Sequence, residues 1–305
     1  MKKMIYYVVI LILVQSCKKT SEDIVYSVDT TGESAQQVGD VMASTDESGG
    51  STSGLYAINS SDMQSTMKAY ARISKDELNT VKISDLFLPE AQAAACNTIA
   101  FTGCSANKRI RTFDGCTVGT AGSITGNITL TFSDAACSAG SSSQTVKRVP
   151  NFTVTGLRGA TFNVSATTAN GQILTRGAGT ASTFANEGIR RTFVTPKGAT
   201  ILDVTTTTGT AINVTGTNRT GRTMSGGSLI LTNNLTNEIC TLTPSTSPVL
   251  TWTGGCSCPT QGFWSGTCSP SSKTFKVTFG ATCGEVTVEN TGETTQTVTL
   301  DRCGA

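Results

Sequence analysis

Among the reactive residue types in this chain, cysteine has the number and spacing that allow the most kinds of chemistry. The 305 residues contain eleven cysteines and no histidine. Without histidine the chain has no Ser-His-Asp triad, no Cys-His nucleophile pair and no histidine metal ligand. The cysteines therefore decide which chemistry is open to the protein.

Ten of the cysteines fall into two clusters, and Cys17 stands apart from both. The early cluster is Cys96, Cys104, Cys116 and Cys137; the late cluster is Cys240, Cys256, Cys258, Cys268, Cys283 and Cys303. Ten is an even number, so an exported chain could form up to five disulfides, each stabilising it by about 2–4 kcal/mol. If each cluster pairs within itself, many connectivities remain open.

One pairing follows from strand register. If Val288 faces Val298 in a hairpin that turns near residues 291–293, then Val286 faces Leu300 and Cys283 faces Cys303. Directly opposed strand residues have Cα atoms about 4.5–5.5 Å apart, which is within disulfide reach. We therefore expect a Cys283–Cys303 disulfide.

Zinc is the alternative use of the late cluster. Cys256, Cys258 and Cys268 could supply three thiolates of a four-thiolate site. The spacing lacks the usual pair of cysteines separated by two residues, so disulfides are the preferred interpretation and no metal or other cofactor is expected.

Carboxylates are the other candidate catalytic groups. The region from Cys96 onward has nine: Asp114, Asp134, Glu187, Asp203, Glu238, Glu285, Glu289, Glu293 and Asp301. A glycosidase needs two carboxylates within about 5–9.5 Å. Glu285 and Glu289 share one strand face but would lie roughly 13 Å apart. We expect all nine to be solvated surface groups, so the sequence does not predict an enzyme.

The N-terminus carries a signal that accounts for Cys17. Lys2 and Lys3 precede an uncharged run, Met4–Val14, which is too short to span a bilayer and has the length of a signal-peptide core. The following Val14-Gln15-Ser16-Cys17 resembles the lipobox of bacterial lipoproteins. The resemblance implies removal of residues 1–16, a diacylglyceryl group on Cys17 and an N-linked acyl chain such as palmitate. Because Lys18 stands where Asp would imply inner-membrane retention, it also implies the outer membrane.

Three further segments follow the signal peptide. Residues 17–59, with a stretch free of apolar residues at 44–54, predict a disordered tether after the lipidated Cys17. Residues 60–95 predict a short helical segment, because Met63, Met67, Tyr70 and Ile73 share one helix face. Leu86–Ala95 predicts a second short helix. We expect this segment to dock on the β domain or on a partner, the β domain being preferred.

Residues 96–305 predict a disulfide-braced β domain, because short runs alternate apolar residues with Thr, Ser or Asn. The candidate strands are Ile124–Phe132, Phe152–Leu157, Thr161–Thr167, Ile201–Thr205, Ala211–Thr215, Ser228–Thr232, Val249–Trp252, Phe275–Phe279, Glu285–Glu289 and Thr297–Leu300. The predicted fold class is mainly β: a large antiparallel meander, either a sandwich or a half-open barrel, with one or two short N-terminal helices.

Charge divides the mature chain. Residues 18–95 are net negative and residues 96–305 net positive. The basic residues concentrate early in the β domain: Lys108, Arg109, Arg111, Lys147, Arg148, Arg158, Arg176, Arg190, Arg191, Lys197, Arg219 and Arg222. A positive face there could meet anionic envelope glycans; an ordinary soluble surface is the alternative. A near-neutral exported chain does not suggest a nucleic-acid partner.

The sequence therefore predicts a non-catalytic outer-membrane lipoprotein that is anchored through its lipid. Its β domain would bind an envelope component or another surface, as an adhesin or a ligand-binding protein does. Trp252, Phe263 and Trp264 are either aromatic anchors for that ligand or core residues. An envelope-assembly or scaffolding protein is the second hypothesis, and a secreted hydrolase is the third.

Overall fold

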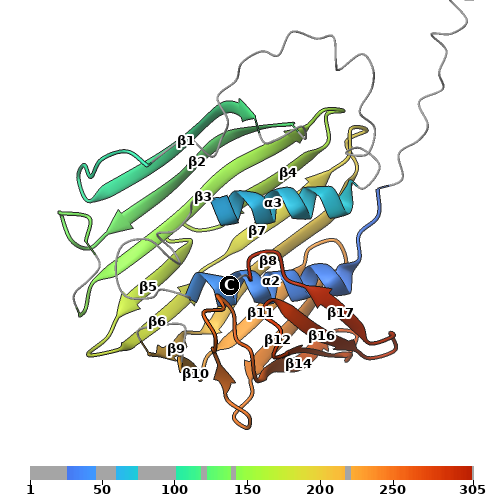
Figure 1. The fold of residues 1–305 in the computed structure, drawn as a ribbon. Coiled ribbons are helices and arrows are strands. Elements are labelled where there is room, and N and C mark those ends of the chain that lie inside the picture. The colour runs from blue at the N-terminus through green and yellow to red at the C-terminus, as the bar shows by residue number, and fades with distance from the viewer. Residues whose placement is uncertain are drawn as a thin grey trace, which may run out of the picture.

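A single open sheet dominates the molecule. The computed structural model describes residues 26–45, 60–74, 101–117, 122–138, 142–216 and 221–303. Strands make up 53% of the chain and form one antiparallel sheet of 17 strands that does not close. The sheet curves, and the two described helices, α2 (Thr30–Thr45) and α3 (Ser60–Ile73), lie across it (Figure 1). The prediction of a mainly β, antiparallel fold with N-terminal helices is confirmed.

The strands follow one another with short connections. In chain order they are β1 (Lys108–Thr117), β2 (Gly122–Phe132), β3 (Thr145–Gly156), β4 (Thr161–Ala166), β5 (Gln172–Arg176), β6 (Ala181–Asn186), β7 (Ile189–Val194), β8 (Thr200–Thr210), β9 (Ile212–Thr215), β10 (Thr223–Ser225), β11 (Ser228–Asn233), β12 (Glu238–Pro244), β13 (Leu250–Thr251), β14 (Phe263–Ser269), β15 (Thr274–Phe279), β16 (Glu285–Asn290) and β17 (Gln296–Thr299). Each of the ten predicted strand segments overlaps one of them.

Two paths of pairing share strand β3. The main path runs β1-β2-β3-β4-β7-β8-β11-β12-β14-β15-β16-β17. A branch leaves the first residues of β3 and runs β5-β6-β9-β10-β13. Strands β8 and β9 are nearly continuous, so the chain passes from the main path to the branch at Ala211. The sheet is therefore wide enough to wrap around a helix.

Where apolar and polar residues alternate regularly, the sequence predicts the strand. Where the alternation is interrupted, the strand cannot be predicted from it. In β15 the side chains of Phe275, Val277 and Phe279 are buried and those between them are not. Strand β1 reverses the expected pattern, since Arg111 is buried while Ile110 is exposed. The sequence did not predict β1, because a charged residue normally marks the solvent face.

The last hairpin corrects the predicted Cys283–Cys303 disulfide. Its turn lies near residue 292 as expected, but Val286 rather than Val288 faces Val298. A shift of two residues leaves the apolar alternation unchanged, so alternation cannot distinguish the two registers. With the observed register the strand pair ends at Glu285 and Thr299, and both cysteines lie beyond it.

Four disulfides join cysteines within the predicted clusters. They are Cys104–Cys137, Cys240–Cys268, Cys256–Cys283 and Cys258–Cys303. Cys240 and Cys268 oppose each other directly on β12 and β14. Cys256, Cys258 and Cys268 each belong to a different disulfide, so the alternative of a zinc site at these residues is wrong. Cys116 is also disulfide-bonded.

Helix α2 (Thr30–Thr45) contradicts the prediction of a disordered tether over 17–59. Thirteen of its sixteen residues are buried. Val38 and Met42 belong to a core shared with the branch strands and with strands β11, β12 and β14–β16. The segment looks like a linker because it is poor in large apolar residues, whereas its burial comes from contacts with residues far along the chain.

Helix α3 (Ser60–Ile73) confirms the predicted helix and its docking on the β domain. Tyr70 and Ile73 are buried in a second core, with residues of β1–β4, β7 and β8. Because both helices contribute to the cores of the sheet, the predicted boundary at residue 96 does not separate folding units. The second predicted helix, Leu86–Ala95, lies outside the described residues. No described helix is long and apolar enough to cross a membrane.

The buried position of α2 can be tested by truncating Met42, which is fully buried. We expect Met42→Ala to lower the free energy of unfolding by about 2–5 kcal/mol, because it leaves a cavity in the core. Urea denaturation followed by tryptophan fluorescence would measure the loss. Ser34→Ala, on the less buried side of the same helix, is the control and should change little. Equal midpoints for both variants would mean that the segment is a tether after all.

Candidate functional site

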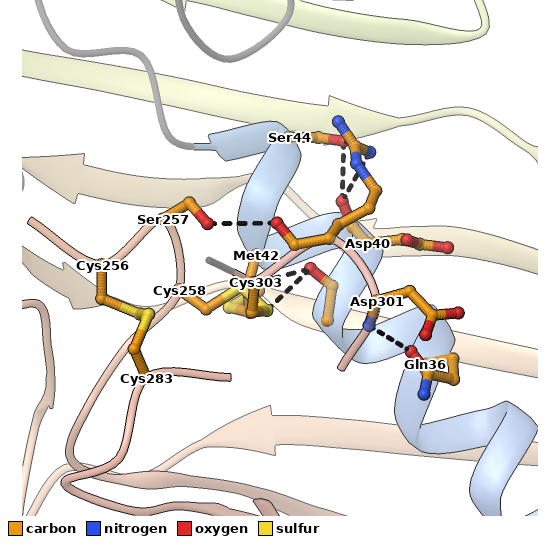
Figure 2. The surroundings of a disulfide bond; sticks show 12 residues. Gln36, Asp40, Met42, Ser44, Cys256, Ser257, Cys258, Cys283, Asp301 and Cys303 are labelled. Atoms are coloured by element: carbon orange, nitrogen blue, oxygen red, sulfur yellow. Dashed lines mark hydrogen bonds between the residues drawn. A yellow bond between two sulfur atoms is a disulfide. The ribbon is translucent and has the colours of Figure 1, made fainter. Parts of the chain in front are cut away.

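The C-terminal segment holds α2 against the sheet through backbone groups (Figure 2). The Gln36 side-chain amide donates to the Thr299 carbonyl at 2.8 Å, and its oxygen accepts from the Asp301 backbone N–H at 2.9 Å. Gln36 thus pairs with the end of β17 as a neighbouring strand would. Arg302 donates to the Asp40 carbonyl and, at 2.9 Å, to the Ser44 hydroxyl. These bonds hold the helix at three positions between Gln36 and Ser44.

The Cys258–Cys303 disulfide lies against the middle of α2 (Figure 2). Its two sulfur atoms are 3.7 and 4.0 Å from the Gly39 carbonyl oxygen. A Cβ atom at residue 39 would lie 2.9 Å from Leu300 Cδ1, which is closer than real contacts allow. Glycine at this position therefore lets the C-terminal segment pack directly on the helix.

A buried ionic cluster joins the two helices. Arg72 of α3 donates to Glu33 of α2 at 2.8 Å and also forms an ion pair with Asp301. Desolvation raises the pKa of Glu33 above its ordinary value, although the hydrogen bond and charge of Arg72 act against the rise. Desolvation also raises the pKa of Asp301. Beside this cluster, Arg191 of β7 forms an ion pair with Asp40.

The space inside this cluster is small. A cavity of about 20 Å³ lies between α2, α3 and the sheet, and Glu33, Asp40, Arg72, Arg191 and Asp301 line it. Such a volume holds roughly one water molecule. The cluster thus connects the helices and offers no room for a substrate.

A larger cleft opens beside the first turns of α2, and we call it the helix cleft. Its volume is about 130 Å³. It is lined by Thr30, Thr31, Glu33, Ser34, Gln37, Leu202, Val204, Leu231, Thr232, Asn233, Thr236, Glu238, Cys240, Cys268, Phe275 and Asn290. The cleft therefore has apolar side chains and a disulfide on its walls together with many hydroxyl, amide and carboxyl groups. A few convergent polar groups in an apolar hollow are typical of small-molecule sites.

Asn290 connects this cleft to a second hollow. Its side-chain amide donates to Thr31 Oγ1 at 3.2 Å and to Glu293 at 2.9 Å. Its Oδ1 atom is buried and has no hydrogen-bond partner. Asn290 and Phe275 also line an open groove of about 530 Å³ over β14–β16, whose other lining includes Thr267, Thr274, Lys276 and Glu289.

The structure revises the predicted roles of the nine carboxylates. Asp203 and Asp301 are not simple surface groups, since Asp203 is buried and Asp301 is paired with Arg72. Arg190 donates two hydrogen bonds to Asp203 and so lowers the pKa of that carboxyl. Glu238 lines the helix cleft together with Glu33. Glu33 was missed as a site residue because it lies in the predicted tether.

The predicted positive face is turned inward in part, and Arg219 lies outside the described residues. Arg111, Arg148 and Arg222 are buried, and Arg190 and Arg191 are paired with carboxylates. Arg148 donates to Gln172, and Arg222 donates to the Thr45 carbonyl at the C-terminal end of α2. A helix C-terminus favours cations, so some of these arginines serve the fold rather than a surface.

The three predicted aromatic anchors also differ in burial. Trp252 and Trp264 are fully buried and donate through their indole N–H groups to Ser257 O and Met42 Sδ. Both are core residues. Phe263 is half-buried, and the Lys276 ammonium lies 5.2 Å from its ring centre. Cys17 lies outside the described residues.

The raised pKa of Glu33 predicts a pH dependence of stability. Between the ordinary value of 4.5 and the raised one, folded Glu33 keeps a proton that the unfolded chain has lost. The free energy of unfolding of the natural protein should therefore fall as pH rises through this window, relative to that of Glu33→Gln. Urea denaturation of both proteins between about pH 4 and pH 8 measures this difference. A constant difference, or one of opposite slope, would contradict the assignment.

The chain matches no family model, no curated protein and no solved structure. Its function must therefore be argued from the chemistry of the site rather than from relatives.

Proposed function

We propose that this protein is a lipid-anchored, non-catalytic binding protein of the bacterial outer membrane, and that its β fold binds a component of the cell envelope. The observation that carries the binding role is the helix cleft, which combines apolar walls with convergent polar groups. Binding is favoured over hydrolysis because Glu33, the carboxyl with a raised pKa at the cleft, is engaged by Arg72.

Cysteine pairing supports the lipid anchor. Eight described cysteines pair with one another, and Cys116 is bonded as well. Only Cys17 and Cys96 remain in the sequence as partners for Cys116. If Cys96 is that partner, one cysteine is left over, and it is the one in the lipobox-like sequence. Two or more acyl chains on it would hold the protein stably at a membrane.

The anchor is tested by Cys17→Ala. We expect this variant to lose its acyl chains. Because the proposed membrane attachment depends on those chains, the variant should move from the membrane fraction to the soluble exported fraction. Mass spectrometry and membrane flotation measure the two effects. Ser21→Ala, close to the same site, is the control. Unchanged membrane association of Cys17→Ala would refute the anchor. Lys18→Asp should shift the protein toward the inner membrane, as the lipoprotein resemblance implies.

A second measurement tests the assignment of cysteines. Peptide mapping of the unreduced natural protein should recover a Cys96–Cys116 disulfide and an acylated Cys17. A Cys17–Cys116 disulfide would leave no thiol for the lipid and would contradict the proposal.

A further inference from the structure

We infer that the helix cleft selects a hydroxyl-rich ligand without negative charge, that is, a saccharide unit that carries no phosphate or carboxylate. The inference rests on the proposed binding function and names its ligand class. It draws on three features of the cleft: the charge of its lining, its open hydrogen-bond acceptor and its size.

Among the residues that the structure describes, those lining the helix cleft include no lysine and no arginine, but they include two glutamates, Glu33 and Glu238. Glu33 is paired with Arg72, so a phosphate or carboxylate ligand would meet the carboxylate of Glu238 with no described cation of the lining to balance the two charges. The helix N-terminus does not change this, although such ends generally attract anions. Asp29 already accepts a hydrogen bond from the Gly32 N–H at 3.0 Å, and Glu33 lies in the first turn. An anionic ligand is therefore disfavoured.

Two side chains of the cleft lining carry hydrogen-bond acceptors with unused capacity, Asn290 and Glu238. Asn290 Oδ1 is buried without a partner. The carboxylate of Glu238 accepts one hydrogen bond, from Ser271, and has capacity for more. The amide of Asn290, by contrast, already donates to Thr31 and Glu293. A ligand with several hydroxyl donors would use the open acceptor capacity of the Glu238 carboxylate, and a site of this kind discriminates strongly against ligands that lack the donors.

The apolar part of the lining and the size of the cleft also suit a sugar. Phe275 and Leu231 give the cleft surfaces that can pack on the C–H groups of a sugar ring, while Thr232 and Thr236 supply hydroxyls. The volume of about 130 Å³ is roughly ten times the space needed for one water molecule. Glu33 is held by Arg72, so Glu238 carries the open carboxylate and is the main acceptor for the ligand.

The test uses three ligands that share one ring. N-acetylglucosamine is neutral, N-acetylglucosamine 6-phosphate is anionic and glucosamine carries an amine. Isothermal titration or NMR titration of the full chain at pH 7 would give the three affinities. We expect binding of N-acetylglucosamine, with the phosphate form at least about tenfold weaker because its charge is unpaired in the cleft. Absence of binding by the neutral sugar, or binding of the phosphate form as strong as that of the neutral sugar, would overturn the inference. Binding of glucosamine at least as strong as that of the neutral sugar would support it, because the open carboxylate of Glu238 attracts an ammonium group.

Matched variants place the binding in the cleft. Thr236 is an exposed turn residue that lines the cleft, whereas Thr241 is exposed on the opposite face of β12. Thr236→Phe should weaken the neutral sugar about tenfold by filling the cleft, and Thr241→Phe should leave its affinity unchanged. Glu238→Gln should weaken it about fivefold, because a charged acceptor becomes neutral. Circular dichroism and the urea midpoint check that each variant is folded.

The outcome separates this inference from the broader function. If the neutral sugar does not bind but the Cys17→Ala protein still leaves the membrane, the anchor stands and the ligand assignment fails. Equal effects of Thr236→Phe and Thr241→Phe would place sugar binding elsewhere on the protein and would also overturn the assignment.

Discussion

The burial of a polar helix is the constraint on which the rest of the structure depends. Helix α2 is packed against the sheet, yet it carries Glu33 in its first turn and Gln36, Gln37 and Asp40 in its central turns. A buried polar group without a partner costs about 1–3 kcal/mol, so the surrounding strands must present partners at fixed positions. Thr206 of β8 donates to Gln37 at 2.7 Å, and the end of β17 pairs with Gln36. The helix thereby determines where the last strand lies.

The same constraint gives the two ends of the helix opposite character. Arg222 and Arg302 bond groups near its C-terminal end, where the helix dipole favours cations. Asp29 caps its N-terminal end. The buried arginines lie outside the helix cleft, and the described residues that line this cleft are acidic or neutral. The charge pattern that stabilises the helix is therefore also the pattern that would reject an anionic ligand.

The sequence predicted those elements whose residue pattern is contained within the element itself. The regular alternation of β2, β4 and β15 was sufficient to predict them. Strands β1 and β7 were not predicted, because inward-facing arginines interrupt the alternation of apolar and polar residues in them. Helix α2 escaped because its partners lie more than a hundred residues away, as in the Gln36–Thr299 contact. The helix cleft was not predicted for the same reason: Glu33 and Glu238 are far apart in the sequence and line one cleft only in the folded chain.

Two disulfides support helix α2 and the cleft beside it. The Cys258–Cys303 disulfide lies on α2, and the Cys240–Cys268 disulfide forms part of the cleft wall. Reduction of the first would release the C-terminal segment that supplies the partners of Gln36 and the bonds from Arg302. The buried polar groups of α2 would then lose partners, and the walls of the cleft would loosen with the helix. A chain kept in a reducing compartment would therefore lack this support for α2 and for the walls of the helix cleft. Disulfides of this kind are typical of chains that fold in an oxidising environment, and this observation does not depend on the lipobox-like sequence.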